Sequence, residues 1–383
     1  ECDGVLVTTP GYDSQSRMFG VFDADQFEMP EPTLECAKDA LSLLESLLSE
    51  FHFANDHDKA AALSAILTAV VRPSLAHAPA FHVRAPSSGS GKSYLCALIS
   101  YFAGPAGSAK VSFPKTSEEA SKVLLALFLT NPPGIEFDDM DTDWIPHGVI
   151  NRALTAEHIT ERILGISKTA TVSTRTLILG SGNNVGPVRD LLRRVATINI
   201  DPQCSTPATI KYEGNPVAEV RRNRGKYVAA ALTIIEAWKR AGSPRANVGD
   251  IVSYGGAWAD CCRHPLIWLG LPDPATSLLE QVSHDPDLEN LGRLLEEWYK
   301  AFGSTPTTLR KALQHHPSNL NDDDTLDDAI REFPVVERGD INRSKLGWIL
   351  KKNEGRIVDG LRFKKGDSKE RNTWMVVKVD DGQ

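Results

Sequence analysis

Two glycines, a lysine and a serine lie close together in residues 85–95, which read APSSGSGKSYL. This grouping is typical of a loop that holds a triphosphate, for which the pattern is G-x-x-x-x-G-K-S/T. Gly89 and Gly91 allow a tight turn with backbone N–H groups aimed inward. Lys92 is expected to reach the β- and γ-phosphates, and Ser93 to ligate Mg²⁺. The residues therefore predict a site for ATP and its metal ion.

The opening position of the pattern differs, because Pro86 stands where the first glycine belongs. That position mainly turns the chain and contributes no essential side chain, so we expect the loop to function. Residues 80–84 read as a strand entering the loop and residues 94–102 as a helix leaving it, which points the positive end of the helix at the phosphates. A flexible Gly/Ser turn is the alternative. The residues expected to contact the nucleotide are Ser87, Ser88, Gly89, Ser90, Gly91, Lys92, Ser93 and Tyr94.

Carboxylates follow a second short apolar strand, in the sequence GIEFDDMD at residues 134–141. Ligands bind at the carboxyl ends of strands in open α/β sheets. Hydrolysis of ATP needs one carboxylate to hold hydrated Mg²⁺ and another to polarise water. We expect Asp138 to hold Mg²⁺ through water and Asp139 to act as the base. Period-two alternation is taken to turn Glu136 to the opposite face, where it would be solvated or paired.

Amides and arginines follow a third apolar strand, predicted over residues 176–179 in TLILGSGNN. Asn183 or Asn184 is expected to lie beside the γ-phosphate and orient the attacking water; an Asn-rich turn is the alternative. Arg193 and Arg194 end the sequence RDLLRR just downstream. Arginine supplied by a neighbouring subunit stabilises charge on a transferring phosphoryl group. A solvated helix end is the other interpretation of this pair.

In this order, GSGKS, FDD, GNN and DLLRR resemble AAA+ ATPases, in particular the superfamily 3-like helicase halves of phage and mobile-element primase–helicases. The sequences PGYD (10–13), LTAEHITERILG (154–165), AAALTIIEAW (229–238) and PLIWLGLPDP (265–274) extend the resemblance over nearly the whole chain. Departures are Pro86 and Asp139, since many relatives have glutamate at the second position. The shorter Asp139 side chain must approach its water from farther back.

The resemblance implies a ring oligomer, expected to be a hexamer, that holds ATP between subunits and draws one DNA strand through its centre. In such rings a hairpin before the asparagine strand projects into the pore. Here that position is residues 163–174, with strands predicted at 162–166 and 171–179 and Lys168 at the tip. A lysine there is suited to grip a phosphate. An ordinary surface lysine is the alternative.

Strands that alternate with helices predict the α/β class with a mainly parallel sheet. With the resemblance, the expected fold is a P-loop AAA+ ATPase core, helical N-terminal and lid segments, and a C-terminal winged-helix-like domain. Helices are predicted from Thr33 or Pro32, over 58–71, over 117–129 with Thr116 or Ser117 as cap, and over 219–241. The expected domains are a lead-in with its helix (1–57), the ATPase core (58–212), a helical lid region (213–302) and the winged-helix-like domain (303–383).

Charge reverses near the C-terminus, since residues 285–340 carry thirteen acids and six bases and residues 341–379 carry eleven bases and four acids. A helix over 343–352, a strand over 357–363, a charged tip and a strand in TWMVVKV follow the order of a winged helix. The basic residues expected to meet DNA phosphates there are Arg343, Lys345, Lys351, Lys352, Arg356, Lys364 and Lys365. Phosphate contact is independent of sequence and sensitive to salt. A winged helix used for protein contact is the alternative.

Composition narrows the function classes. The chain has 383 residues and a net charge of −8, so nucleic-acid contact must come from local basic patches. No apolar run reaches the roughly 18 residues of a membrane helix, so we expect no membrane partner and no secretory leader. Six cysteines without a C-x-x-C pair favour a reduced protein in the cytoplasm of a bacterial host. The start at Glu1 suggests a piece of a longer chain.

The function predicted is an ATP-dependent DNA helicase or translocase that acts in replication of a phage or mobile element. The alternative is an origin-binding or helicase-loading ATPase that binds DNA without unwinding it. A small-molecule kinase or NTPase with an incidental basic tail is a third possibility.

Overall fold

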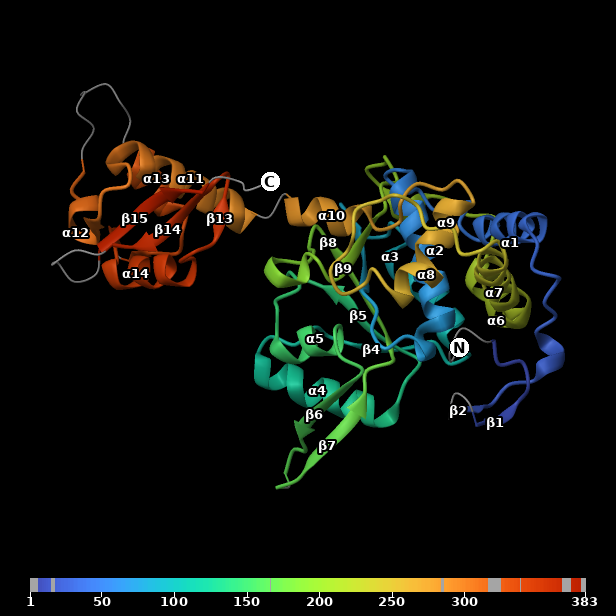
Figure 1. Ribbon diagram of the computed structural model, residues 1–383. Helices are drawn as coiled ribbons and strands as arrows, with labels where there is room; N and C mark the ends of the chain where they lie inside the picture. Colours follow the sequence, from blue (N-terminus) through green and yellow to red (C-terminus); the bar gives the residue numbers. More distant parts are fainter. Residues whose placement is uncertain are drawn as a thin grey trace. The chain divides into compact units, whose positions relative to one another are not determined.

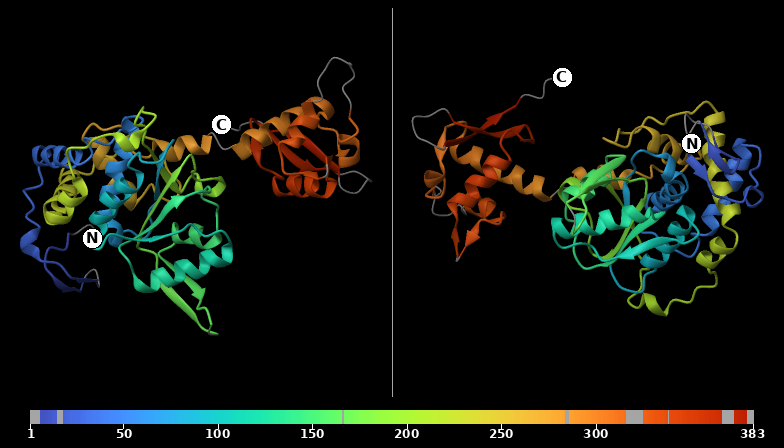
Figure 2. Two further views of the ribbon diagram at one scale, coloured as in Figure 1. Left: turned by 180° about the vertical axis from the view of Figure 1, so that it is seen from behind. Right: turned by 90° about the horizontal axis from the view of Figure 1, so that it is seen from below.

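The computed structural model describes residues 6–14, 18–165, 167–283, 286–315, 325–337, 339–366 and 373–379. It divides the chain into two compact units, one ending at Ser283 and one beginning at His284 (Figures 1 and 2). Each unit has its own hydrophobic core.

A five-stranded parallel sheet forms the centre of the first unit. All four pairings between its strands are parallel. In spatial order its strands are β4 (Ser108–Val111), β5 (Gly134–Met140), β8 (Leu177–Asn183), β3 (Ala80–Ala85) and β9 (Val195–Asn199). Because the strands are parallel, their carboxyl ends meet at one edge of the sheet, where ligands bind in open α/β sheets.

Helices cover both faces of this sheet (Figure 1), as expected for a parallel sheet. Alternate residues of β8 serve the two faces, because Leu177 and Leu179 enter one buried cluster and Ile178 enters the other. The first cluster contains α2 (Asp56–Val71), α3 (Lys92–Ala103) and α7 (Arg224–Arg240), and the second contains α4 (Ser117–Thr130) and α5 (Gly148–Ala153). The predicted α/β class with a parallel sheet is confirmed.

Side-chain caps set the starts of the predicted helices. Thr33 Oγ1 accepts a hydrogen bond from Cys36 N at the start of α1 (Leu34–Ser46), and Thr116 Oγ1 accepts one from Glu119 N at the start of α4. These side chains satisfy N–H groups that have no partner within the helix. Of the two starts proposed for each helix, Thr33 and Thr116 are therefore the ones used.

The prediction of a single helix over residues 219–241 is wrong. The chain forms α6 (Pro216–Arg222) and α7, with a break at Asn223. At the start of α7, a Cβ added to Gly225 would lie 1.8 Å from the carbonyl oxygen of Gln26, so the backbones approach closely there. Tertiary packing at this point outweighs the continuous helical periodicity of the sequence.

The two strands predicted at 162–166 and 171–179 have different bounds in the structure. The hairpin consists of β6 (His158–Arg162) and β7 (Thr169–Ser173), and β8 is a separate strand. The buried guanidinium of Arg72 donates to the carbonyl oxygens of Thr174 and Thr176, at 2.6 and 3.2 Å, and burial lowers its pKa to about 10. Because Arg72 takes these carbonyls, the chain leaves β7 before it enters β8.

The remaining elements of the first unit are short. They are β1 (Gly11–Asp13) and β2 (Met18–Gly20), which form a hairpin, the helices α8 (Ala257–Cys262), α9 (His264–Trp268) and α10 (Thr276–Ser283), and 3-10 turns at Ala24–Gln26, Arg72–Ser74, Arg189–Leu191 and Pro207–Thr209. Within the described part of the chain, no helix has the length and apolar character needed to cross a membrane.

The second unit is a four-stranded antiparallel sheet with helices. Helix α11, expected in the lid region, belongs to this unit, because Leu294, Leu295 and Trp298 lie in its core. Helix α14 has the predicted bounds, and its Leu346, Ile349 and Leu350 are buried. The elements are α11 (Pro286–Phe302), β10 (Thr307–Thr308), α12 (Leu309–Ala312), α13 (Thr325–Arg331), β11 (Val336–Glu337), β12 (Asp340–Ile341), α14 (Arg343–Lys352), β13 (Ile357–Val358), β14 (Leu361–Lys365) and β15 (Thr373–Lys378).

The strand predicted over 357–363 is divided in the structure. It forms β13 and β14, which pair with each other across a turn in which Asp359 and Gly360 have φ of +48° and +71°. The charged tip predicted between the last two strands lies outside the described residues, as does the acidic run at 322–324.

Candidate nucleotide site

Three neighbouring strands bring the predicted site residues to one edge of the sheet. Strand β8 lies between β3, which leads into the glycine-rich loop, and β5, which carries the carboxylates. Ala85 is paired with Asn183, and Phe137 with Gly180. The loop, the amide and the carboxylates therefore meet at the carboxyl ends of adjacent parallel strands.

The loop follows a path that requires glycine at two positions. Gly89 and Gly91 have φ of +75° and +90°, in the left-handed region that L side chains rarely adopt. A Cβ on Gly89 would also lie 2.8 Å from Ala208 Cβ. Gly91 is the N-cap of α3, so the loop ends at the positive end of that helix. Ser90 Oγ donates to Ser87 O at 2.8 Å and closes the loop on itself.

Lys92 is buried, with 7% of its surface exposed. Its Nζ donates to Ser87 O at 3.0 Å and to Asn183 Oδ1 at 2.5 Å. Burial lowers the pKa of Lys92, and the nearby negative charge of Asp139 opposes that shift. The cation is therefore held between the loop and the end of β8 by two neutral oxygens.

The two candidate amides have different positions. Asn183 contacts Lys92, whereas Asn184 Nδ2 donates to Pro86 O at 3.2 Å. Asn184 also has a positive φ of +52°. Asn184 therefore braces the entry to the loop at Pro86, and Asn183 is the amide that the structure brings to the lysine.

Asp138 receives hydrogen bonds on both carboxylate oxygens. Oδ1 accepts from Ser93 Oγ at 2.9 Å and from Ser181 Oγ at 3.0 Å, and Oδ2 accepts from Lys110 Nζ at 2.8 Å. Burial disfavours its charge, but these donors together lower the pKa of Asp138. An ionised carboxylate beside a serine hydroxyl is a set of hard oxygen donors, so these residues fit Mg²⁺.

A bulge in β5 separates the two aspartates. The pairing with β8 shifts register between Phe137 and Met140, and Asp139 has φ of +50°. A bulge redirects the side chains that follow it. Asp138 is therefore aimed at Ser93, while the Asp139 carboxylate is exposed at the edge of the sheet.

Lys110 and Glu136 are members of this cluster that the sequence did not single out for a role. Lys110 Nζ lies 3.1 Å from Glu136 Oε1 as well as 2.8 Å from Asp138. Glu136 is buried, which raises its pKa, and Lys110 acts against that shift. Because one lysine contacts both acids, Glu136 and Asp138 share a face, and the expectation that Glu136 turns to the opposite face is wrong.

Arg193 and Arg194 both pair with Asp190 of their own segment, and Arg194 also contacts α5. Arg193 Nη2 and Arg194 Nη2 lie 2.5 and 3.0 Å from the two oxygens of Asp190, and Arg194 Nη1 donates to Asn151 O. The Arg193 side chain is 46% exposed and that of Arg194 is 14% exposed. In the described residues of this single chain, these contacts leave both arginines outside the Asp138 cluster.

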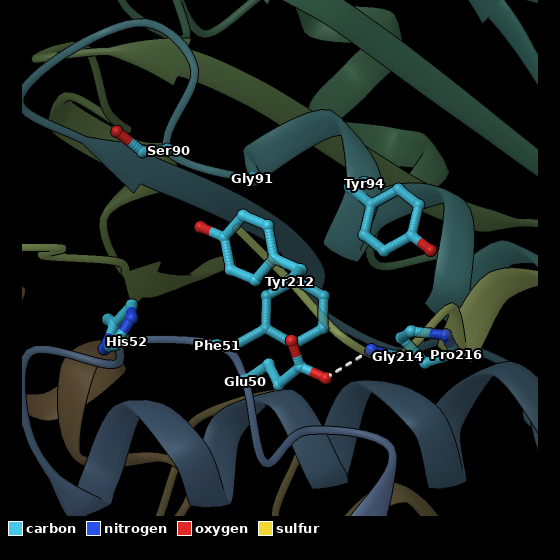
Figure 3. A pocket seen from close by; sticks show the side chains of 9 residues that line it. All are labelled: Glu50, Phe51, His52, Ser90, Gly91, Tyr94, Tyr212, Gly214 and Pro216. Atoms are coloured by element: carbon cyan, nitrogen blue, oxygen red, sulfur yellow. Dashed lines mark hydrogen bonds between the residues drawn. The ribbon is translucent and has the colours of Figure 1, made fainter. Parts of the chain in front are cut away.

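An aromatic pocket of about 300 Å³ adjoins the loop. Figure 3 shows the rings of Phe51, Tyr94 and Tyr212 gathered beside Gly91. Tyr94 stacks on Phe51 with ring centroids 6.1 Å apart. These residues come from the α1–α2 connection, the first turn of α3 and the segment before α6, so only Tyr94 belonged to the predicted site.

A buried histidine on β3 links the strand that leads into the loop to two neighbouring segments. His82, on β3, accepts a hydrogen bond at Nδ1 from Trp144 Nε1, and its Nε2 donates to Val185 O at 2.8 Å. Both bonds require the neutral ring with its proton on Nε2. Burial lowers the pKa of His82 to about 4. The histidine ties the segment after Asn183 to the loop strand.

We expect acid to destabilise the first unit through His82. Its pKa in the folded chain lies below the ordinary 6.5, so its stabilisation is complete above pH 6.5 and is lost as the pH falls toward 4. Between pH 7 and 4.5 this one group should remove about 2–3 kcal/mol from the free energy of unfolding. Urea unfolding at both pH values should show a smaller loss in His82→Gln than in the wild type. The matched control is His158→Gln, at an exposed position on β6; an equal pH dependence in all three proteins would contradict the assignment.

The predicted DNA-binding residues are exposed in both units. Lys168 lies in the turn of the β6–β7 hairpin, where its carbonyl accepts from Ile163 N. The seven predicted basic residues of the second unit are all exposed. Lys345 pairs with Glu337 at 2.6 Å, and Lys352 lies over the exposed ring of Trp348. The structure thus places these residues at surfaces, in two separate units.

The chain has a P-loop-like α/β core, with a strand, a glycine-rich loop and a helix beside a carboxylate strand. No protein-family model matches the chain, and no curated protein matches its sequence. It is similar to the apo C-terminal region of NrS-1, with 14% identity, a TM-score of 0.38, and coverage of 92% of this chain and 76% of that one. It is also similar to JCV helicase bound to a thiazolopyridine compound, with 10% identity, a TM-score of 0.27, and coverage of 68% and 71%. Similarity at this level shows nothing about activity.

Proposed function

We propose that the chain is an Mg²⁺-dependent ATPase that drives a DNA helicase or translocase. The observation that carries the ATPase is the pairing of Lys92 with Asn183 and of Ser93 with Asp138 at one edge of the sheet. A cation, an amide, a hydroxyl and a carboxylate are the groups that phosphoryl transfer to water requires.

Each residue has a role in this proposal. Lys92 leaves Ser87 and Asn183 to bind the phosphates, and Asn183 orients the attacking water. Asp139, exposed beside Lys92, takes a proton from that water. Ser93 and Asp138 hold Mg²⁺, which when bound neutralises charge on the phosphate oxygens. Lys110 keeps Asp138 ionised, since its ammonium contacts that carboxylate in the structure.

Two basic surfaces support the proposal that DNA is the substrate. The β6–β7 hairpin extends from the first unit (Figures 1 and 2) and exposes Arg162 and Lys168 near its turn. In the second unit, α14 is followed by the hairpin of β14 and β15, in the order expected of a winged-helix-like DNA-binding domain. We infer that the first unit contains the AAA+ core and lid, and that it acts in replication of a phage or mobile element.

We further propose a ring oligomer, expected to be a hexamer, with the β6–β7 hairpin lining its pore. In this arrangement Lys168 grips one strand of DNA, and Arg193 or Arg194 reaches the nucleotide of the next subunit. The exposure of Arg193 supports that role, because a residue acting across an interface must be available at the surface of one chain.

Strand displacement on a forked duplex tests the helicase. Lys168→Ala should lower unwinding at least about tenfold relative to hydrolysis measured without DNA, because the lost contact is a charged one. Lys38→Ala, at an exposed lysine on α1, is the matched control and should change neither rate. A protein that binds DNA and hydrolyses ATP but displaces no strand would instead be an origin-binding or loading ATPase. Unwinding unaffected by Lys168→Ala would contradict the grip.

A further inference from the structure

The aromatic pocket beside the loop differs from a site that recognises a base through hydrogen bonds to its edge. Its side walls are the rings of Phe51, Tyr94 and Tyr212, and Gly91 lies at its border with the phosphate loop. Aromatic faces stack on any base, since every base has a π-face. Discrimination among bases depends on fixed donors and acceptors at the edge, so the hydrogen-bonding groups of the pocket decide its selectivity.

The polar side chains of the pocket are mostly engaged within the protein. Glu50 accepts from Glu213 N at 2.9 Å and from Gly214 N at 2.6 Å, and the second of these bonds is drawn in Figure 3. The hydroxyl of Tyr94 donates to Asn215 Oδ1 at 2.6 Å, and that of Ser90 donates to Ser87 O. These groups hold the 212–216 segment and the loop in place.

Part of the backbone along the pocket is engaged as well. Phe51 N donates to Leu48 O at 3.1 Å, and Phe51 O accepts from Phe53 N at 3.2 Å. His52 O accepts from Asp201 N at 2.8 Å. These backbone groups of Phe51 and His52 are therefore occupied by the turn itself and by the chain that follows β9.

Two polar groups at the rim have no fixed role as donor or acceptor. The Tyr212 hydroxyl and the His52 ring each can donate or accept a hydrogen bond. Both residues are exposed. Adenine and guanine present a donor and an acceptor at corresponding positions, N6 and O6. Groups of this kind satisfy either edge equally and leave no buried partner unpaired.

We propose that this pocket holds the nucleotide base by stacking alone, so that the site takes ATP, GTP, CTP and UTP with little preference. The inference rests on the proposed function, which places the triphosphate in the adjoining loop. It adds the substrate class, a nucleoside triphosphate of any common base. The relative concentrations of the triphosphates then decide which one the site binds and hydrolyses.

Competition binding with the full chain and Mg²⁺ tests this without relying on turnover. Unlabelled ATP, GTP, CTP and UTP would each displace a ribose-labelled fluorescent ATP. We expect their four dissociation constants to agree within about tenfold, as for a pocket without fixed edge contacts. Tripolyphosphate, which has no base, should bind at least about tenfold more weakly than ATP, because a stacked base contributes that much.

Variants of the rim separate stacking from edge reading. Tyr212→Ala should weaken all four nucleotides alike, by about tenfold, whereas Tyr212→Phe should leave the ratio of ATP to GTP affinity unchanged. Tyr12→Ala, at an exposed tyrosine on β1, is the matched control. A spread above tenfold among the four nucleotides, or tripolyphosphate binding as tightly as ATP, would overturn the inference while leaving an ATPase. Displacement by none of the competitors would instead overturn the proposed function.

Discussion

Lys92→Met is expected to lower kcat/KM for nucleotide hydrolysis by at least about a hundredfold, because it removes the cation aimed at developing phosphate charge. The wild-type ammonium is already positioned at the end of β8, where it contacts Ser87 O and Asn183 Oδ1. Phosphate release measured over a range of ATP concentrations, at saturating Mg²⁺, gives this ratio. Lys115→Met, at an exposed lysine outside the loop, is the matched control and should retain the wild-type rate.

For the same variant, Lys92→Met, we expect no comparable loss of stability. Burial lowers the pKa of Lys92, so the folded chain gives up free energy to keep this charge in its site. An apolar methionine of similar length should leave the free energy of unfolding within about 1 kcal/mol of the wild type, or raise it. Loss of activity with retained stability would place Lys92 in the chemistry. Loss of both would show that the variant disturbs the loop, and full activity would remove Lys92 from the proposed site.

Local sequence patterns were sufficient to predict much of the fold and the centre of the site. The strand, the loop and α3 follow from alternating apolar residues, from the left-handed glycines Gly89 and Gly91, and from a helix that starts at the loop. Thr33 and Thr116 cap helices because a hydroxyl at that position bonds the N–H three residues on. The contact of Ser93 with Asp138 follows from strand polarity alone, since parallel strands share one carboxyl edge.

Contacts between segments that are distant in the chain could not be predicted from local sequence patterns. Lys110 reaches Glu136 and Asp138 only because β4 pairs with β5 in the register that sets Lys110 opposite Glu136. The break between β7 and β8 depends on Arg72, a hundred residues earlier in the chain. The aromatic pocket joins three segments whose closeness is a product of the whole fold. In each case the deciding term is a tertiary partner, which a single stretch of sequence does not name.

The second large effect is expected at the arginine pair, where the structure separates two roles. Arg193→Ala should lower kcat by about a thousandfold or more, as for an arginine that stabilises the transition state from a neighbouring subunit. Its affinity for ATP should stay close to that of the wild type, because the contacts of Arg193 among the described residues are with Asp190 of its own segment. Single-turnover hydrolysis and nucleotide binding, measured on the assembled protein, give the two quantities.

Arg194→Ala is the comparison that makes this result specific. Arg194 is largely buried, pairs with Asp190 and donates to the carbonyl of Asn151, so its removal loses an ion pair and a hydrogen bond at a largely buried position. We expect it to lower the free energy of unfolding by about 1–3 kcal/mol, whereas Arg193→Ala should lower it by less than about 1 kcal/mol. If Arg194→Ala alone removes turnover without affecting stability, the roles of the two arginines are reversed.

Mixing two inactive proteins tests whether the arginine acts between subunits. Arg193→Ala retains Asp139, and Asp139→Asn retains Arg193, so an interface formed by one of each in the right order is complete. Random equimolar mixing in a ring makes about a quarter of the interfaces complete, since every interface is the same head-to-tail contact. Recovery of about that share of wild-type activity supports action across the interface. No recovery in a mixture that assembles into one particle would place the arginine within its own subunit, and full activity of Arg193→Ala and Arg194→Ala combined would remove the pair from the mechanism.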